Sequence, residues 1–252
     1  MKRELSVFLI TKQEGKNLRT CLQSVKEIAD EIIILDSGST DQTLAIAQEF
    51  GAKTAFKEFT SFTEQKNAAL QMCSKPWALS LDADEYLTPA LLEEIKELLN
   101  SKDMDLCQGY YLKRSNVFLG REMKHGGVHN EKILRLVKTG SARYVGGRVH
   151  EVLQTQGKTG ELENVFMHNT YTSIEQYFGK FNRYTSLAAQ TMAERGKKFK
   201  AVQLIRPPLE FFKIYILKLG FLDGIQGFLW ALFSSFYPAV KYAKLWEIYK
   251  NK

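Results

Sequence analysis

The sequence predicts an α/β fold in which a mostly parallel sheet is flanked by helices. Short apolar runs alternate with amphipathic stretches through the first hundred residues. This alternation is what a parallel sheet built from βαβ units requires. At 252 residues, 44% of them hydrophobic, the chain suits one sizeable domain with an appendage and is too short for two full domains.

Four short runs of mostly aliphatic or β-branched residues have the length of buried strands, namely Leu5–Ile10, Glu31–Leu35, Thr54–Phe56 and Trp77–Leu81. The stretches between them have a helical period, so we expect helices at Lys16–Lys26, Thr40–Phe50 and Phe62–Met72. Residues 1–100 are therefore predicted to form a Rossmann-like half.

The pattern changes in the second part of the chain. A helix is expected at Pro89–Leu99, because Thr88 is a good N-cap and proline suits the first helical turn. Strand-like sequence with glycine-rich interruptions follows to about residue 168, and residues 173–194 have a helical pattern. We expect a domain over 1–194, with halves 1–100 and 101–170, and a separate helical region over 195–252.

The net charge of +7 is unevenly distributed. Residues 1–193 hold 24 Lys and Arg against 24 Asp and Glu, whereas residues 194–252 hold 11 against 4. Such an asymmetry points to a polyanionic partner, either nucleic acid or an anionic membrane surface. The aromatic residues there lie in nearly continuous apolar sequence rather than on a basic platform, so we expect a membrane and no nucleic acid.

The cysteines and the N-terminus indicate a reducing compartment. Cys21, Cys73 and Cys107 are too few for a disulfide framework and lack the paired spacing of a zinc site. The first apolar run, Ser6–Ile10, is too short for a signal peptide. We expect a cytoplasmic protein with three buried thiols.

Acidic residues follow one of the predicted strands at a tight turn. The run Ile32–Leu35 leads into Asp36, Gly38 and a predicted helix capped by Ser39 or Thr40. Ligands of open α/β sheets bind beyond the carboxyl ends of the strands, so Asp36 is placed to accept hydrogen bonds from a ribose or base. The alternative is that Asp36 only caps the turn.

A second predicted strand ends in the same way. Leu79–Leu81 leads into Asp82 and Asp84, one residue apart, which suit Mg²⁺ or Mn²⁺ together with substrate phosphates. A solvated acidic loop is the alternative. Because both acidic ends belong to one predicted parallel sheet, they should lie at one edge and could share a ligand. Lys66, on the preceding helix, would then meet a phosphate or else stay exposed.

Two rival functions leave part of the pattern unexplained. A nucleotidyltransferase would share the sheet and the acidic pair, but Thr11–Glu14 is not the glycine-rich basic loop that it needs. An RNA-binding or membrane-binding module would account for the basic tail and not for the acidic strand ends.

Four blocks, taken in order and spacing, resemble family 2 glycosyltransferases of the GT-A fold: Ser6–Thr11 with Glu14, Asp36–Asp41, Gln65–Asn67 and Asp82–Glu85. The resemblance implies a site for a UDP-sugar donor and a divalent metal ion. It implies Thr11, Glu14 and Asp36 near the nucleoside, Lys66 near the diphosphate, and Asp84 on Mg²⁺ or Mn²⁺. Ser37 and Asp82 are expected to bind the donor as well. One departure is Gln13, where the family usually has Asn.

The second half resembles enzymes that add a sugar, often glucose from UDP-glucose, to the inner core of lipopolysaccharide. The matching segments are Asn116–Arg121, Arg135-Leu136, Gly147–Glu151 and Gly220–Gly224. The resemblance implies that His129, Arg135 and His150 bind a lipid-linked saccharide acceptor. Related enzymes carry aromatics where this chain has Gly126–Asn130, which leaves another lipid-linked or cell-surface glycan as the alternative acceptor.

An inverting transfer needs a base that takes the proton of the acceptor hydroxyl. Our choice is Glu151, which lies in the block that the resemblance places against the acceptor; the alternative is that it pairs with Arg148 or another basic residue. Glu131 and His129 are reserves, and Glu85 is expected to support the metal ligands. The spacing of the loop histidines fits no zinc site.

The segment Leu219–Val240 is apolar and aromatic, contains one charged residue, Asp223, and is bracketed by lysines. Its length would just span a bilayer, but a carboxylate in hydrocarbon costs about 3 kcal/mol. We therefore expect residues 195–252 to lie on an anionic membrane surface, at the inner face of the bacterial inner membrane. The alternative is a buried helical hairpin packed on the domain.

Overall fold

The computed structural model describes residues 2–146 and 151–251. Its residues form two compact units. Unit 1 comprises Met1–Arg114 and Asn130–His168, and unit 2 comprises Ser115–His129 and Asn169–Lys252.

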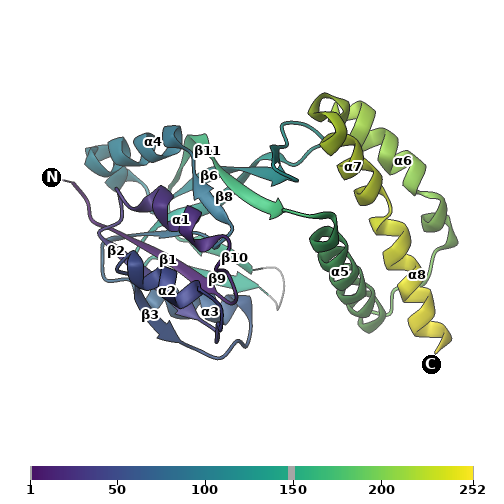
Figure 1. Cartoon of the computed structure of the whole chain (residues 1–252), viewed down its shortest axis with the longest axis horizontal. Coiled ribbons are helices and arrows are strands. Elements are labelled where there is room, and N and C mark those ends of the chain that lie inside the picture. Colours follow the sequence, from purple (N-terminus) through teal and green to yellow (C-terminus); the bar gives the residue numbers. More distant parts are fainter. Residues whose placement is uncertain (1, 147–150, 252) are drawn as a thin grey trace. The chain divides into compact units, whose positions relative to one another are not determined.

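Unit 1 begins with the expected parallel half (Figure 1). Its strands are β1 (Leu5–Thr11), β2 (Glu31–Asp36), β3 (Lys53–Phe56) and β4 (Trp77–Ser80), and its helices are α1 (Leu18–Val25), α2 (Thr43–Glu49) and α3 (Phe62–Gln71). Every strand end lies within one residue of the predicted one, so this part of the prediction is confirmed. Strands β1 and β2 are buried along almost their whole length, as strands covered on both faces are.

The chain then turns to antiparallel pairing. The elements are β5 (Glu85–Leu87), α4 (Pro89–Asn100), η1 (Lys102–Leu106), β6 (Gly109–Phe118), β7 (Arg121–Glu122), β8 (His129–Lys138), β9 (Ala142–Gly146), β10 (Glu151–Thr155) and β11 (Thr159–Tyr171). Thr88 caps α4 as predicted, since its side chain accepts from the amide of Leu91. Strands β6, β8 and β11 each continue from unit 1 into unit 2.

The main sheet is mixed, with strand order β3-β2-β1-β4-β8-β6-β11-β5 and β7 paired to β6. Strands β1 to β4 are parallel, and β8 adds antiparallel to β4. Apolar clusters fill both faces of the sheet, and the three cysteines are free and buried, as expected. Strands β9 and β10 form a separate two-stranded sheet. The α/β class with a largely parallel donor half is therefore confirmed.

Unit 2 is mainly helical. Its helices are α5 (Ile174–Glu194), η2 (Ala201–Ile205), α6 (Pro207–Phe212), the π-helical turn η3 (Lys213–Leu217), η4 (Gly220–Asp223), α7 (Gly224–Ser235) and α8 (Tyr237–Lys250). Helix α5 packs along α8, and the two run side by side in Figure 1. Aromatic side chains around Phe118 and Tyr177 form the core of the unit.

Two features of unit 2 differ from expectation. The predicted helix over 173–194 is present as α5, but it packs on α8 and so belongs with the C-terminal helices rather than with the domain before residue 195. Trp230 and Phe233, which we expected at a membrane surface, pack instead against the aromatic core, with Trp230 5.4 Å from Phe118 between ring centroids. One face of α7 is therefore buried, and the side chains that it packs against belong to unit 2.

Candidate active site

Two loops at the carboxyl ends of β1 and β2 form the first part of the predicted site. Thr11 and Asp36 are register partners in the parallel pair, and the Thr11 hydroxyl donates to Asp36 Oδ1 at 2.8 Å. Asp36 Oδ2 accepts from the amides of Gly38 and Ser39, both at 2.7 Å, and the Ser39 hydroxyl donates to Oδ1. Gly38 has a φ of +90°, a backbone conformation that residues with a side chain rarely adopt.

Asp36 therefore caps the turn, as the alternative interpretation held. Burial raises the pKa of Asp36, but the hydrogen bonds from Ser39, Thr11 and Gly38 lower it by more, so the carboxyl stays ionised. Its contact with a ribose or base stays a prediction.

Gln13, where the family usually has Asn, links two loops at the predicted nucleoside site. The Gln13 backbone has a φ of +59°, and its side-chain oxygen accepts from the amides of Thr40 and Asp41 at 3.0 and 3.2 Å. The amide of Glu14 donates to Thr43 Oγ1 in the same loop pair, and the Glu14 carboxylate accepts from Asn17. Gln13 thus ties the β1 loop to the β2 loop, which is where the nucleoside is expected.

Helix α3 brings a third segment to this edge. Gln65 Nε2 donates to the Ser37 hydroxyl at 2.6 Å and to the carbonyl of Lys57 at 2.9 Å. The next residue, Lys66, is buried, with 7% of its side chain exposed. Gln65 is thus the hydrogen-bond anchor of the helix. Lys66 faces the loop after β4 that carries Asp82 and Asp84, called the acidic loop below.

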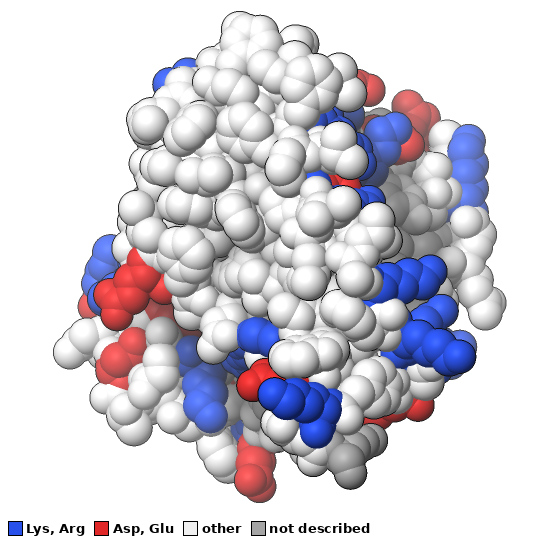
Figure 2. All heavy atoms as spheres, turned by 90° about the vertical axis from the view of Figure 1, so that its right-hand side faces the viewer, with Lys and Arg blue, Asp and Glu red and all other residues white. Residues whose placement is uncertain are grey.

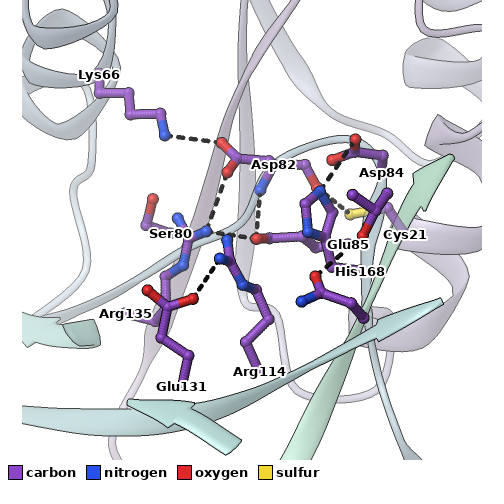
Figure 3. Close-up of polar contacts among 12 residues, drawn as sticks. Cys21, Lys66, Ser80, Asp82, Asp84, Glu85, Arg114, Glu131, Arg135 and His168 are labelled. Carbon is purple, nitrogen blue, oxygen red and sulfur yellow. Dashed lines mark hydrogen bonds and ion pairs between the residues drawn. The ribbon is translucent and has the colours of Figure 1, made fainter. Parts of the chain in front are cut away.

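Lys66 links two carboxylates that lie far apart in the sequence. Its Nζ is 2.8 Å from Asp82 Oδ1 and 2.9 Å from Glu151 Oε1. Asp82 Oδ2 lies 3.0 Å from the guanidinium of Arg135, as Figure 3 shows. About a third of the Asp82 side chain remains exposed, whereas Lys66 and Arg135 are almost fully buried. The acidic loop is therefore held by two cations beneath it and stays open to a ligand.

The electrostatics of the cluster keep its cations charged. Burial lowers the pKa of Lys66, but the Asp82 carboxylate raises it by more, and the net shift is upward. Burial likewise raises the pKa of Asp82, but Lys66 and Arg135 lower it strongly. The Lys66 ammonium and the Asp82 carboxylate are thus both ionised at neutral pH.

Arg135 is placed differently from our expectation. It was expected at the acceptor, but its side chain is 5% exposed, lies between Asp82 and Glu85, and stacks over the ring of Phe166. Glu85 is fully buried against it, and burial outweighs the attraction of Arg135, so the pKa of Glu85 is raised. The Glu85 carboxylate also accepts from the amide of Asp82. Arg135 and Glu85 therefore position the acidic loop from behind.

Asp84 and His168 form a pair that the sequence analysis missed. Asp84 Oδ2 lies 3.4 Å from His168 Nε2, and both side chains are about one fifth exposed (Figure 3). His168 is the register partner of Glu85 across β5 and β11, so strand pairing brings it to the acidic loop. A histidine after the apolar pair Phe166-Met167 is the only trace of this role in the sequence.

The pair suits a divalent cation. Carboxylate oxygens bind Mg²⁺ and Mn²⁺, and neutral imidazole is a common metal ligand. Neighbouring ligands of an octahedral ion are about 3.0 Å apart, near the 3.4 Å found between Asp84 and His168. Among the described residues no group of three or more His, Cys, Asp or Glu side chains could hold a metal ion. Substrate phosphates would therefore supply the remaining ligands.

The other predicted site residues are less closely grouped. Glu151, at the start of β10, is 15% exposed and pairs with Lys66, a basic residue, as the alternative interpretation held. Arg148 and His150 lie outside the described residues. His129 belongs to unit 2, where its Nδ1 lies 2.9 Å from the Ser115 hydroxyl. The reserve base Glu131 pairs with Arg114 at the surface.

Comparison with known proteins gives a consistent assignment. The model for glycosyl transferase family 2 matches residues 6–149. An uncharacterized glycosyltransferase of Rickettsia typhi is 31% identical over 98% of this chain and 88% of its own length. The lipopolysaccharide core biosynthesis glycosyltransferase LpsC of Rhizobium meliloti is 31% identical over 98% of this chain and 93% of its own length.

Among solved structures, S. aureus TarS is similar with a TM-score of 0.48 and 16% identity, over 93% of this chain and 49% of that one. The family model covers more than half of the chain, and the two relatives align with nearly all of it. The chain therefore belongs to glycosyl transferase family 2 and is a nucleotide-sugar-dependent glycosyltransferase with a GT-A fold.

Proposed function

We propose that this enzyme transfers glucose from UDP-glucose, with inversion, to a hydroxyl of the inner core of lipopolysaccharide or lipooligosaccharide. Support for the acceptor class comes from the near full-length similarity to LpsC. The observation that carries the mechanism is the row Glu151–Lys66–Asp82 at the edge of the sheet. It puts a candidate base, a buried cation and the acidic loop within direct contact.

The donor would bind across the loops after β1, β2 and β4. Thr11, Glu14, Asp36 and Ser37 would surround the nucleoside, and Lys66, held between Asp82 and Glu151, would attract the diphosphate. A buried, charged lysine is suited to this task, because charge interactions are stronger away from bulk water. A divalent cation held by Asp84 and His168 would offset the negative charge that develops on the departing nucleotide.

Glu151 is the proposed base. Its Oε1 is held by Lys66 at 2.9 Å, and its Oε2 has no partner among the residues that the structure describes. Oε2 would take the proton of the acceptor hydroxyl as that oxygen forms its bond to the anomeric carbon. The electrons of the broken sugar–phosphate bond leave with UDP, and attack from the opposite face inverts the anomeric centre.

The test measures UDP release from UDP-glucose with truncated inner-core saccharide as acceptor. Glu151→Gln should lower kcat at least about 100-fold, the usual contribution of a general base, and leave UDP affinity unchanged. Glu131→Gln is the matched control and should keep its activity. Near wild-type turnover by Glu151→Gln would remove Glu151 from the mechanism.

The donor and the acceptor are tested separately. UDP-galactose and GDP-mannose in place of UDP-glucose should give no product if the donor assignment is correct. The segment Gly126–Asn130 favours a second acceptor class, another lipid-linked or cell-surface glycan, because it lacks the aromatics of related enzymes. Transfer to such a glycan and not to inner core would replace the acceptor and leave the donor site standing.

A further inference from the structure

The segment Val202–Phe228 of unit 2 carries an unusual concentration of exposed apolar side chains. The most exposed are Ile205, Leu209, Leu217 and Ile225, which show 73, 72, 66 and 63% of their surface. Soluble proteins rarely leave such side chains together in water without a binding role. Figure 2 faces this side of the molecule and shows its upper part almost free of charged residues.

The exposed side chains of the α6–η3 segment lie on the opposite side of the helix from its packed core. Phe211 and Tyr215 lie on the inner side of the α6–η3 segment, where each ring centroid is 5.7 Å from that of Phe228 on α7. Leu209 and Phe212, three residues apart, are both exposed on the helix that also carries this inner side. The inward side is already packed, so the outward side chains are available to a partner.

The turn between the two helical segments is closely packed. A side chain on Gly227 would come within 1.9 Å of the carbonyl oxygen of Gly220, so the backbones touch there. Asp223, the single acid of the predicted apolar segment, is 2% exposed and accepts from the amides of Lys124 and His125. The Asp223 carboxylate is thus buried inside unit 2 and does not interrupt the apolar surface.

Basic residues accompany the apolar ones. Arg206, Lys213 and Lys218 are all exposed. The acids of Val202–Phe228 are Glu210, which pairs with Arg206 and Lys213, and the buried Asp223. Below and beside the apolar area, Figure 2 shows lysine and arginine together with acidic residues. An apolar surface with cationic residues around it is complementary to lipid with anionic headgroups.

We infer that Val202–Phe228 docks this chain on an anionic lipid bilayer, with its apolar side chains at the level of the headgroups. Among the described residues no single helix is long and apolar enough to cross a membrane, and the one bent pair that passes by length and composition, Pro207–Leu217 with Gly220–Lys250, turns by 74°. A sharp turn with exposed residues along it favours an interfacial position. The inference narrows the predicted membrane surface from residues 195–252 to Val202–Phe228. It rests on unit 2 alone and is independent of the proposed reaction.

The test is flotation of the purified full chain with vesicles of phosphatidylethanolamine and phosphatidylglycerol, compared with phosphatidylcholine alone. Leu209→Ser with Leu217→Ser should weaken binding to anionic vesicles at least about ten-fold, from the apolar area lost. Phe56→Ser with Leu106→Ser removes two equally exposed apolar side chains from unit 1 and should bind like wild type. Circular dichroism checks that every variant folds.

The electrostatic part has its own variant. Lys213→Gln with Lys218→Gln should reduce binding to anionic vesicles by about five-fold per charge and leave binding to phosphatidylcholine unchanged. The inference is overturned if wild type binds neither vesicle, if both apolar pairs weaken binding equally, or if the chain forms dimers through this surface and ignores lipid. UDP binding, measured on the two variants of unit 2, Leu209→Ser with Leu217→Ser and Lys213→Gln with Lys218→Gln, should stay at the wild-type level, so a failure of docking and a failure of the reaction are told apart.

Discussion

Replacing Arg135 with methionine tests whether the acidic loop is held by buried charge. Arg135 is 5% exposed and contacts Asp82 and the fully buried Glu85. Removing it leaves Glu85 as an unpaired buried carboxylate, which typically costs about 3–5 kcal/mol. Asp82 adds little to this cost, because it is one-third exposed and keeps its contact with Lys66.

The loss should depend on pH in a defined direction. The pKa of Glu85 is already raised by burial, and the loss of Arg135 raises it further. A carboxyl with a raised folded-state pKa contributes stability that is present below its unfolded pKa and is lost as the pH rises through its folded pKa. Arg135→Met should therefore be destabilised more at pH 8 than at pH 5.

The assay is urea unfolding of unit 1. Trp77 is buried in unit 1, and the other two tryptophans, Trp230 and Trp246, lie in unit 2. In a background of Trp230→Phe and Trp246→Phe, Trp77 fluorescence reports unit 1 alone. Adding Glu85→Gln to Arg135→Met should recover about 2 kcal/mol at pH 8, since the unpaired charge is gone. A loss below about 1 kcal/mol, or one equal at both pH values, would refute the reasoning.

Three further outcomes are expected. Burial raises the pKa of Glu31, but hydrogen bonds from Lys53, Ser6 and Ser74 lower it to about 2. Glu31 therefore contributes about 3 kcal/mol to the free energy of unfolding above pH 4.5, and this contribution disappears as the pH falls toward 2. In urea titrations, Glu31→Gln should lose less stability with falling pH than wild type, and an equal loss in both proteins would contradict the prediction. Gly227→Ala would force a contact of 1.9 Å with the carbonyl oxygen of Gly220. Overpacking of this kind costs about 1–3 kcal/mol, so we expect a lower unfolding midpoint of unit 2 by circular dichroism, whereas an unchanged midpoint would show that the turn can open. His168→Gln should raise the Mn²⁺ concentration for half-maximal activity at least about ten-fold, and an unchanged requirement would take His168 out of the metal site.

The parallel half could be predicted because its signals are local. Strands β1, β2 and β4 are short apolar runs that are buried along almost their whole length, so hydrophobicity alone marks them. Strand β3 lies at the edge of the sheet and is mostly exposed, so its predicted burial was wrong although its position was right. Asp36 and the pair Asp82 and Asp84 follow from the rule that ligands bind at the carboxyl ends of parallel strands. These residues lie where that rule places them.

The rest of the site depends on contacts between distant segments. Glu151 meets Lys66 across 85 residues, and His168 meets Asp84 across 84, through strand pairings that no local pattern specifies. Arg135 lies within an apolar strand, and its burial becomes visible only once β8 is placed beside β4. The same holds for α5, whose position against α8 is decided by tertiary packing and not by its own sequence.

The exposed surface of unit 2 could be predicted only in part. Composition indicated an apolar, basic region after residue 195, and that region is present. Which aromatics face inward was not predictable, because Trp230 and Phe233 have the same apolar character as Phe212 and Phe221, and only packing around Phe118 separates them.

The central claim is that the acidic strand ends of unit 1 bind a nucleoside diphosphate together with a divalent cation. The most direct measurement is calorimetric titration of UDP into the purified protein, with and without Mn²⁺, for wild type and Asp84→Ala. We predict that UDP binds in a Mn²⁺-dependent way and that the substitution abolishes this dependence. Equal UDP binding with and without Mn²⁺, or full binding by Asp84→Ala, would contradict the claim.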